Sequence, residues 1–163
     1  MFYNKKYAPG TPNPKVARFT TGKFRDDYDY KLQLICLTKI QIRSNALESA
    51  RVAVSKKLAS VGEENFYLRV VTYPHRVNRE NKMIATAGAD RLQEGMRKAF
   101  GKPVGVSARV NIGSVVIDLL VKEENLEKAK EGMRSAIAKL PLKWKVVVIP
   151  LKTKAVEAEA AAA

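Results

Sequence analysis

The sequence predicts a two-layer α+β fold, in which two helices cover one face of a mixed or mainly antiparallel sheet. Two strand-helix-strand units support this prediction, one in the N-terminal half and one in the C-terminal third. Each helix has one apolar stripe, which needs a sheet face to cover it. The 163 residues fit a single domain over residues 1–150, followed by an alanine-rich tail at 151–163.

The first unit begins after an N-terminal arm of 25 residues. This arm is basic and contains three prolines, so we expect its first part to lie extended along a partner until about Lys15. There the segment KVARFTTG can become a first strand. Residues 30–43 alternate between apolar and polar side chains, which predicts one long strand.

A helix follows the long strand. Ser44 or Asn45 offers an N-cap, and Asn45 and Glu48 have the spacing of a capping box. Apolar residues then recur at helical spacing until Gly62, which suits the position after a helix end. Residues 65–72 are strand-like and complete the first unit.

The second unit starts with a predicted hairpin. Residues 108–110 and the β-branched run at 114–121 flank a short turn that contains Gly113. Residues 126–140 place apolar side chains at helical spacing, and Pro141 ends that helix. The run KWKVVVI, which follows the proline, predicts the last strand.

The net charge of +14 and the pI of about 10.0 predict a polyanionic partner. Nucleic acid is the commonest such partner inside cells, and acidic membrane or an acidic protein are weaker alternatives. The first 25 residues carry a net +6 without any acid, and residues 73–113 carry a net +5. Most of the excess charge therefore lies outside the two strand-helix-strand units and the tail.

Residues 73–113 are the predicted working part of the chain. They show no sustained period and hold five of the nine glycines. Connections of this length are uncommon in compact domains and usually serve a function. The cations can neutralise phosphates, the glycines permit close approach, and Tyr73 or Phe100 could stack on a base. Alternatively, Phe100 anchors the segment on the protein and the cations are simply solvated.

Several classes of protein are excluded by composition. No apolar run is long enough to span a membrane or to form a signal peptide, which predicts a soluble intracellular protein. One cysteine, Cys36, excludes an internal disulfide, and with the one histidine, His75, it is too little for a structural zinc site. We therefore expect no metal and no cofactor.

Catalytic interpretations are weak. His75 with Glu80 or Asp90 could form a base and its orienting carboxylate, but a lone histidine in a basic segment more often contacts RNA or backbone. Cys36 lies in an apolar strand and is expected to be a core residue. The segment GMRKAFGK fails as a phosphate-binding P-loop, because five residues separate its glycines and Pro103 follows the lysine. We predict that the protein is not an enzyme.

Long runs of the sequence resemble a known family. They are YPHRVNRENKM at 73–83, AGADRLQEGMRKAFGKPVG at 87–105, ARVNIG at 108–113, IRSNALESAR at 42–51 and the helix end KLP at 139–141. These runs closely resemble the archaeal large-subunit ribosomal protein L-ten-e, in the universal L-sixteen family. The resemblance extends over residues 15–149. The opening MFYNKKY and the alanine-rich tail depart from the family pattern.

The resemblance implies an α/β-hammerhead type of fold and a structural role in the large ribosomal subunit. Family members bind ribosomal RNA (rRNA) near the central protuberance, and their central loop extends toward the peptidyl-transferase cavity and the acceptor ends of tRNA. The implied partners are large-subunit rRNA, tRNA acceptor ends, neighbouring ribosomal proteins and late-assembly factors. We expect no membrane and no homo-oligomer, and we expect a cytoplasmic, ribosomal location. The alternative is a stand-alone RNA-binding or RNA-modifying factor.

Two groups of site residues are predicted. The expected rRNA-binding residues are Lys5, Lys6, Lys15, Arg18, Lys23, Arg25, His75, Arg76, Arg79, Lys82, Arg91 and Arg109. The loop expected near tRNA consists of Gly95, Met96, Arg97, Lys98, Ala99, Phe100, Gly101, Lys102 and Pro103. Lysine and arginine neutralise phosphates and release counterions, while the folded body recognises rRNA shape.

Overall fold

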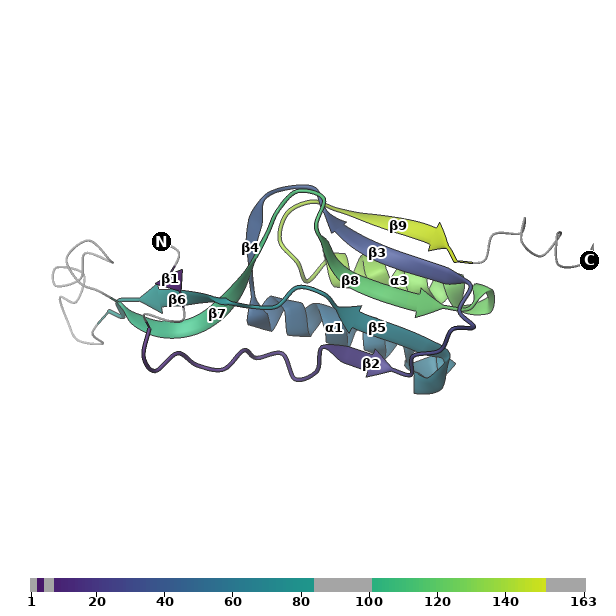
Figure 1. The fold of residues 1–163 in the computed structure, drawn as a ribbon, viewed down its shortest axis with the longest axis horizontal. Helices are drawn as coiled ribbons and strands as arrows, with labels where there is room; N and C mark the ends of the chain where they lie inside the picture. Colours follow the sequence, from purple (N-terminus) through teal and green to yellow (C-terminus); the bar gives the residue numbers. More distant parts are fainter. Residues whose placement is uncertain (1–2, 5–7, 84–100, 152–163) are drawn as a thin grey trace, which may run out of the picture.

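The computed structural model describes residues 3–4, 8–83 and 101–151 (Figure 1). It confirms the α+β fold class, with two antiparallel sheets and two α-helices in the described ranges. The strands are β1 (Tyr3–Asn4), β2 (Thr20–Gly22), β3 (Tyr30–Cys36), β4 (Ile40–Arg43), β5 (Phe66–Val70), β6 (Arg76–Glu80), β7 (Lys102–Val110), β8 (Val115–Val121) and β9 (Trp144–Pro150). The α-helices are α1 (Ser44–Leu58) and α3 (Leu126–Ile137), and short 3₁₀ helices occupy Ala59–Val61, Glu63–Asn65 and Glu123–Asn125.

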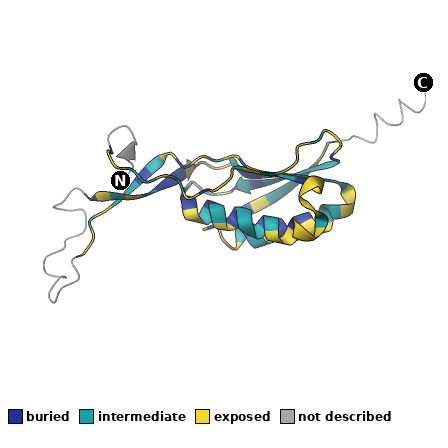
Figure 2. Ribbon diagram, turned by 90° about the horizontal axis from the view of Figure 1, so that it is seen from below, coloured by how far each residue is buried: buried dark blue, intermediate teal, exposed yellow. Residues whose placement is uncertain are grey.

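The larger sheet has the order β2-β5-β8-β3-β9, with every neighbouring pair antiparallel. Both helices pack on one face of this sheet and turn their buried residues toward it (Figure 2). The core includes Leu34 of β3, Leu119 of β8, Val54 of α1 and Met133 of α3, all fully buried. Burial of these apolar stripes is the main stabilising term that joins the two layers.

The smaller sheet has the order β1-β6-β7-β4. Its central pair, β6 and β7, forms a ribbon that extends away from the helices in Figure 1. The expectation of a connection without regular structure over residues 73–113 is therefore wrong at 76–80 and 102–107, which are paired strands, whereas the strand expected at 108–110 is present as the end of β7. Basic and glycine residues in these strands hid the alternation. Residues 84–100, which join β6 to β7, lie outside the described ranges.

The predicted long strand over residues 30–43 is wrong as a single element. It comprises β3 in the larger sheet and β4 in the smaller one, separated by residues 37–39. Even-numbered side chains, such as Leu34 and Ile42, are buried on both sides of this break. Because the alternation keeps the same parity through the bend, the pattern could not reveal it.

The predicted hairpin between residues 108–110 and 114–121 is also wrong. Strands β7 and β8 are consecutive, but they belong to different sheets. The turn bonds instead to the end of β3, where the Gly113 N–H donates to the Cys36 carbonyl (2.8 Å) and the Cys36 N–H donates to the Ser114 carbonyl (3.0 Å). Gly113 has φ +81°, which favours glycine. The turn therefore passes the chain between sheets rather than closing a hairpin.

The described part of the N-terminal arm contacts the protein itself, and its expected extension along a partner until about Lys15 stays a prediction. Ala8 and Val16 are buried, and the Ala17 N–H donates to Glu48 on α1 (3.2 Å). The first strand of the larger sheet is shorter than predicted and comprises only Thr20–Gly22. Among the described residues of the arm, Ala8 and Val16 are buried, while Lys15, Arg18 and Lys23 are exposed.

The first α-helix ends at Leu58, a few residues before the predicted end at Gly62, and it also starts differently. Gly62, with φ +89°, follows the 3₁₀ turn that ends α1. The capping box predicted from Asn45 and Glu48 is absent, since α1 starts after Arg43 with no side-chain cap. The Glu48 side chain instead accepts hydrogen bonds from Arg51 and from the Ala17 N–H of the arm. The capping-box spacing therefore occurs in the sequence without forming the box.

Candidate nucleic-acid interface

The β6–β7 ribbon gathers predicted rRNA-binding residues. Its register pairs Arg76 with Ser107, Arg79 with Pro103 and Glu80 with Lys102, with an irregularity after Asn78. His75 and Lys82 lie just beyond the two ends of β6, and Arg109 is exposed on β7. The ribbon thus brings cations from two distant parts of the sequence onto one projecting element (Figure 1).

The predicted cations of the arm differ in their exposure and pairing. Lys15, Arg18 and Lys23 are exposed and form no ion pair within the part of the chain that the structure describes. Arg25 is half-buried, and its guanidinium pairs with Glu64 at 3.3 Å. A paired arginine contributes less net field than a free one, so Arg25 is the weakest of these four candidates.

Other predicted site residues lie outside the described ranges. They are Lys5, Lys6, Arg91, Gly95, Met96, Arg97, Lys98, Ala99 and Phe100. Of the predicted loop, Gly101 is buried, Lys102 is exposed and Pro103 is half-buried at the start of β7. Lys102 is therefore an exposed cation at the first position of β7, at the end of the ribbon.

Several cations on the helix side of the molecule are neutralised. Lys57 on α1 lies 2.5 Å from Glu131 on α3, and Lys122 lies 3.0 Å from Asp27. Hydrogen bonds from these two lysines lower the pKa values of Glu131 and Asp27 below their ordinary range. Exposed pairs of this kind lower the net positive charge around the two lysines.

A polar network crosses the smaller sheet. Gln41 Nε2 on β4 donates to Asn78 Oδ1 on β6 (2.9 Å) and also to the Ser107 hydroxyl on β7, which lies between them. The Ser107 hydroxyl donates to the same Asn78 oxygen (2.8 Å). Ser107 is fully buried, so these bonds satisfy its hydroxyl and tie the ribbon to the body.

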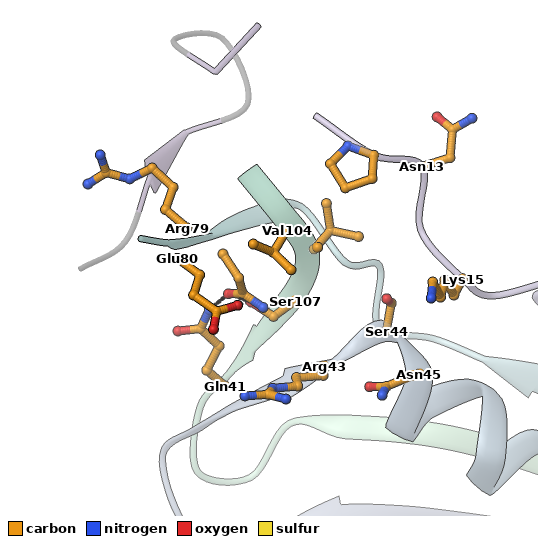
Figure 3. A pocket seen from close by; sticks show the side chains of 14 residues that line it. Asn13, Lys15, Gln41, Arg43, Ser44, Asn45, Arg79, Glu80, Val104 and Ser107 are labelled. Carbon is orange, nitrogen blue, oxygen red and sulfur yellow. Dashed lines mark hydrogen bonds between the residues drawn. The ribbon is translucent and has the colours of Figure 1, made fainter. Parts of the chain in front are cut away.

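A groove of about 660 Å³ opens beside this network (Figure 3). Asn13 and Lys15 of the arm form one side, and Val104 and Ser107 of β7 form the other. Residues 43–45, at the junction of β4 and α1, line the groove between them. Three segments that are distant in the sequence thus meet at one polar, basic hollow.

Sequence reasoning missed Arg43, Ser44, Asn45, Gln41 and Asn78 as candidate binding residues. The signal available was the RSN run at the helix start, where Ser44 and Asn45 were interpreted as cap candidates and the run itself as part of a family motif. Its role depends on the arm and the ribbon lying opposite it, and no local pattern in the sequence predicts that arrangement.

An aromatic pair lies beside the ribbon. Tyr73 stacks on Phe19 with ring centroids 5.3 Å apart, and 54% of Tyr73 remains exposed. Its free surface is available for a base, as the sequence suggested. Phe100, the other aromatic candidate, lies outside the described ranges.

The weak catalytic candidates do not form a site among the described residues. His75 is exposed, and its Nδ1 lies 3.1 Å from the Tyr73 carbonyl oxygen. Cys36 is fully buried and its Sγ donates to the Thr38 carbonyl (2.7 Å), so its assignment to the core is confirmed. Asp90 lies outside the described ranges.

The ranges that the structure describes hold neither a metal cluster nor a helix suited to a bilayer. No three His, Cys, Asp or Glu side chains there gather closely enough to bind a metal ion. Neither α1 nor α3 has the length and apolar character needed to cross a membrane.

Comparison with known proteins gives a consistent result. A sequence model of ribosomal protein L16p/L10e matches residues 3–147. The chain is 51% identical over 152 residues to the large ribosomal subunit protein uL16 of Staphylothermus marinus, covering 93% of this chain and 87% of that protein. It is 52% identical over 155 residues to uL16 of Hyperthermus butylicus, covering 94% and 86%. For uL16 of Sulfolobus acidocaldarius the identity is 51% over 159 residues, covering 94% and 89%.

These matches extend over both sheets, both helices and the segment between β6 and β7. They confirm the resemblance inferred from the central motifs, and a structural family of this kind agrees with the expectation of a non-enzymatic role. The chain belongs to the ribosomal protein L16p/L10e family.

Proposed function

We propose that this chain is a structural constituent of the large ribosomal subunit that binds rRNA near the central protuberance. The observation that carries the proposal is the projecting β6–β7 ribbon, which carries Arg76, Arg79 and Lys102. Family membership supports it, since the relatives are named large ribosomal subunit proteins. The protein would then act in the cytoplasm, as part of the ribosome.

Binding would be mainly electrostatic and shape-dependent. Exposed cations of the arm, such as Lys15 and Arg18, would neutralise rRNA phosphates and release counterions. The rigid body, with its buried core, would hold these cations in fixed positions against rRNA helices. Chemistry at the ribosomal catalytic centre would belong to RNA, with this chain supplying position.

The segment between β6 and β7 is proposed to reach toward the peptidyl-transferase cavity and the acceptor ends of tRNA. The two strands carry both of its ends on the projecting ribbon, with Lys102 exposed at the point of return. Neighbouring ribosomal proteins and late-assembly factors are the further partners proposed.

Sedimentation of the tagged chain from an archaeal cell tests the main proposal. We expect the chain to co-migrate with large subunits in stoichiometric amount after a moderate salt wash. A mainly free pool would contradict it and favour the alternative, a stand-alone RNA-binding or RNA-modifying factor.

A paired substitution tests the role of the segment. Arg97→Ala with Lys102→Ala should leave the thermal melt unchanged and reduce peptide synthesis or subunit maturation, because both cations are proposed to serve RNA rather than packing. Lys128→Ala, at an exposed position on α3, is the matched control and should leave both measurements unchanged. Unfolding of the double variant would show that the residues are structural.

A further inference from the structure

The first turn of α1 leaves its backbone N–H donors without a side-chain cap. Arg43 occupies the N-cap position, and its side chain makes no capping bond. The first turn contains no acidic residue. The leading N–H groups of a helix have no intrahelical acceptor, and the helix dipole places positive potential there. This end of α1 is therefore prepared for an anion that the chain itself does not supply.

Ser44 provides an independent indication of a ligand. The residue is only 6% exposed, yet its hydroxyl forms no hydrogen bond with any residue that the structure describes. Ser44 lines the groove, and its Oγ points into the hollow in Figure 3. A hydroxyl that is left open toward a groove is thus suited to a bound group.

The charge around Ser44 defines that group as anionic. Arg43, Lys15 and Asn45 line the same groove as Ser44. Glu48, the first acidic residue of α1, is held by Arg51 and by the Ala17 N–H. The carboxylate of Glu80 also lines the groove, next to Gln41 in Figure 3 rather than beside Ser44.

The far side of the groove has a different chemistry. Gln41, Asn78 and Glu80 line it with amide and carboxylate groups. Such groups can hydrogen-bond the edge of a nucleobase. A volume of about 660 Å³ is within the range of small-ligand sites, so it can hold one nucleotide.

We propose that the groove binds one unpaired RNA nucleotide, with its phosphodiester at the start of α1. The Ser44 hydroxyl and the free N–H groups of the first turn donate to the phosphate, and Arg43 and Lys15 neutralise it. The base lies toward Gln41 and Asn78. This inference rests on the proposed function and adds to it a specific phosphate-binding site away from the tip of the ribbon.

The site is tested by titrating the full chain with a large-subunit rRNA fragment at several salt concentrations. Ser44→Ala should weaken binding roughly tenfold, since it removes a hydrogen bond to a charged group. Arg43→Met should lower the slope of log affinity against log salt by about 0.7, because one phosphate contact is lost. Ser49→Ala, an exposed serine on the same helix, is the matched control and should change neither value.

Folding and proposed function are checked separately. Circular dichroism melts should be the same for all three variants and the wild type. If the wild type fails to bind rRNA, the proposed function and this site are both overturned. If the wild type binds while Ser44→Ala and Arg43→Met bind equally well with an unchanged salt slope, the site alone is overturned.

Amide NMR shifts identify the source of the phosphate. A short single-stranded RNA should shift the Asn45 and Ala46 amides at lower concentration than inorganic phosphate does. If RNA and inorganic phosphate shift these amides at the same concentration, the site binds free anions and the assignment to RNA is overturned. Shifts confined to the ribbon would exclude α1 as the binding element.

Discussion

Glu48 and Arg51 form an ion pair one turn apart on α1, and through it the helix holds the N-terminal arm. Arg51 donates to both carboxylate oxygens of Glu48, at 2.5 and 3.0 Å. Glu48 also accepts from the Ala17 N–H, and Arg51 donates to the Thr21 hydroxyl (3.2 Å) on β2. The pair therefore joins three segments: the helix, the arm and the edge strand of the larger sheet.

This arrangement predicts acid-sensitive stability. The hydrogen bonds from Arg51 hold the pKa of Glu48 below its ordinary value of 4.5. A carboxylate with a lowered pKa stabilises the folded state above its unfolded pKa, and this stability is lost as pH falls through the folded pKa. Glu48→Gln should lower the free energy of unfolding by about 1 kcal/mol at pH 7. Urea titrations at pH 7 and pH 3 should show a smaller difference between variant and wild type in acid.

The exposed pair of Lys57 and Glu131 is the matched control for that prediction. Both side chains are largely in water, so Glu131→Gln should leave the free energy of unfolding nearly unchanged. An equal loss in both variants would show that the contacts with Ala17 and Thr21 add nothing.

Gly22 is predicted to tolerate no side chain. It has φ +91°, and a Cβ atom there would lie 2.1 Å from the carbonyl oxygen of Phe66 on the neighbouring strand. Gly22→Ala should destabilise the fold by about 2–4 kcal/mol, measured by urea unfolding. Gly10 has φ +72° and open space around it, so it isolates the backbone effect. Gly10→Ala should lower the free energy of unfolding by only about 1 kcal/mol. If Gly22→Ala and Gly10→Ala lower the free energy of unfolding by similar amounts, the contact between β2 and β5 can relax.

Gly132 is predicted to be replaceable with a gain. It lies within α3 against α1, where an added Cβ would meet Val54 at 3.5 Å and Lys57 at 3.7 Å, which are ordinary contacts. Because glycine disfavours helix interiors, Gly132→Ala should raise the free energy of unfolding by about 0.5–1 kcal/mol. Gly132→Leu should reverse the gain by forcing the helices apart, as a thermal melt would reveal. Destabilisation by alanine would mean that the helices pack more tightly than these distances indicate.

Met133 tests the layer between helices and sheet. Its side chain is fully buried in the core cluster, so Met133→Ala should lower the free energy of unfolding by about 2–5 kcal/mol through lost burial and a residual cavity. Leu142 is a control of similar size at an exposed position, and Leu142→Ala should change stability by no more than about 0.5 kcal/mol. Chemical denaturation of both variants provides the comparison.

Local periodicity predicted the helices well. The stripe of Leu47, Ala50, Val54 and Leu58 is buried as expected, because an amphipathic helix exposes its apolar spacing directly in the sequence. Long and specific sequence motifs likewise identified the family. The sequence by itself therefore determined the α+β class, the two helices, the separation of charge into arm and centre, and the ribosomal family.

Tertiary structure alone decided how the strands divide between sheets. Leu34 and Ile42 keep one parity through the bend at residues 37–39, so alternation could not distinguish one strand from two. Similarly, β7 and β8 are adjacent in sequence, but each pairs with more distant strands that complete its sheet. Strand pairing depends on which partners bury a face, and that choice is not local.

The groove was also decided only in three dimensions. Ser44 has the position of a helix cap in the sequence, and it becomes a candidate phosphate ligand only because Lys15 of the arm and Ser107 of β7 lie across the same hollow. A binding site needs convergent groups from separate segments. Its chemistry is determined by residue types, but its geometry follows from long-range packing of the arm and the ribbon against α1.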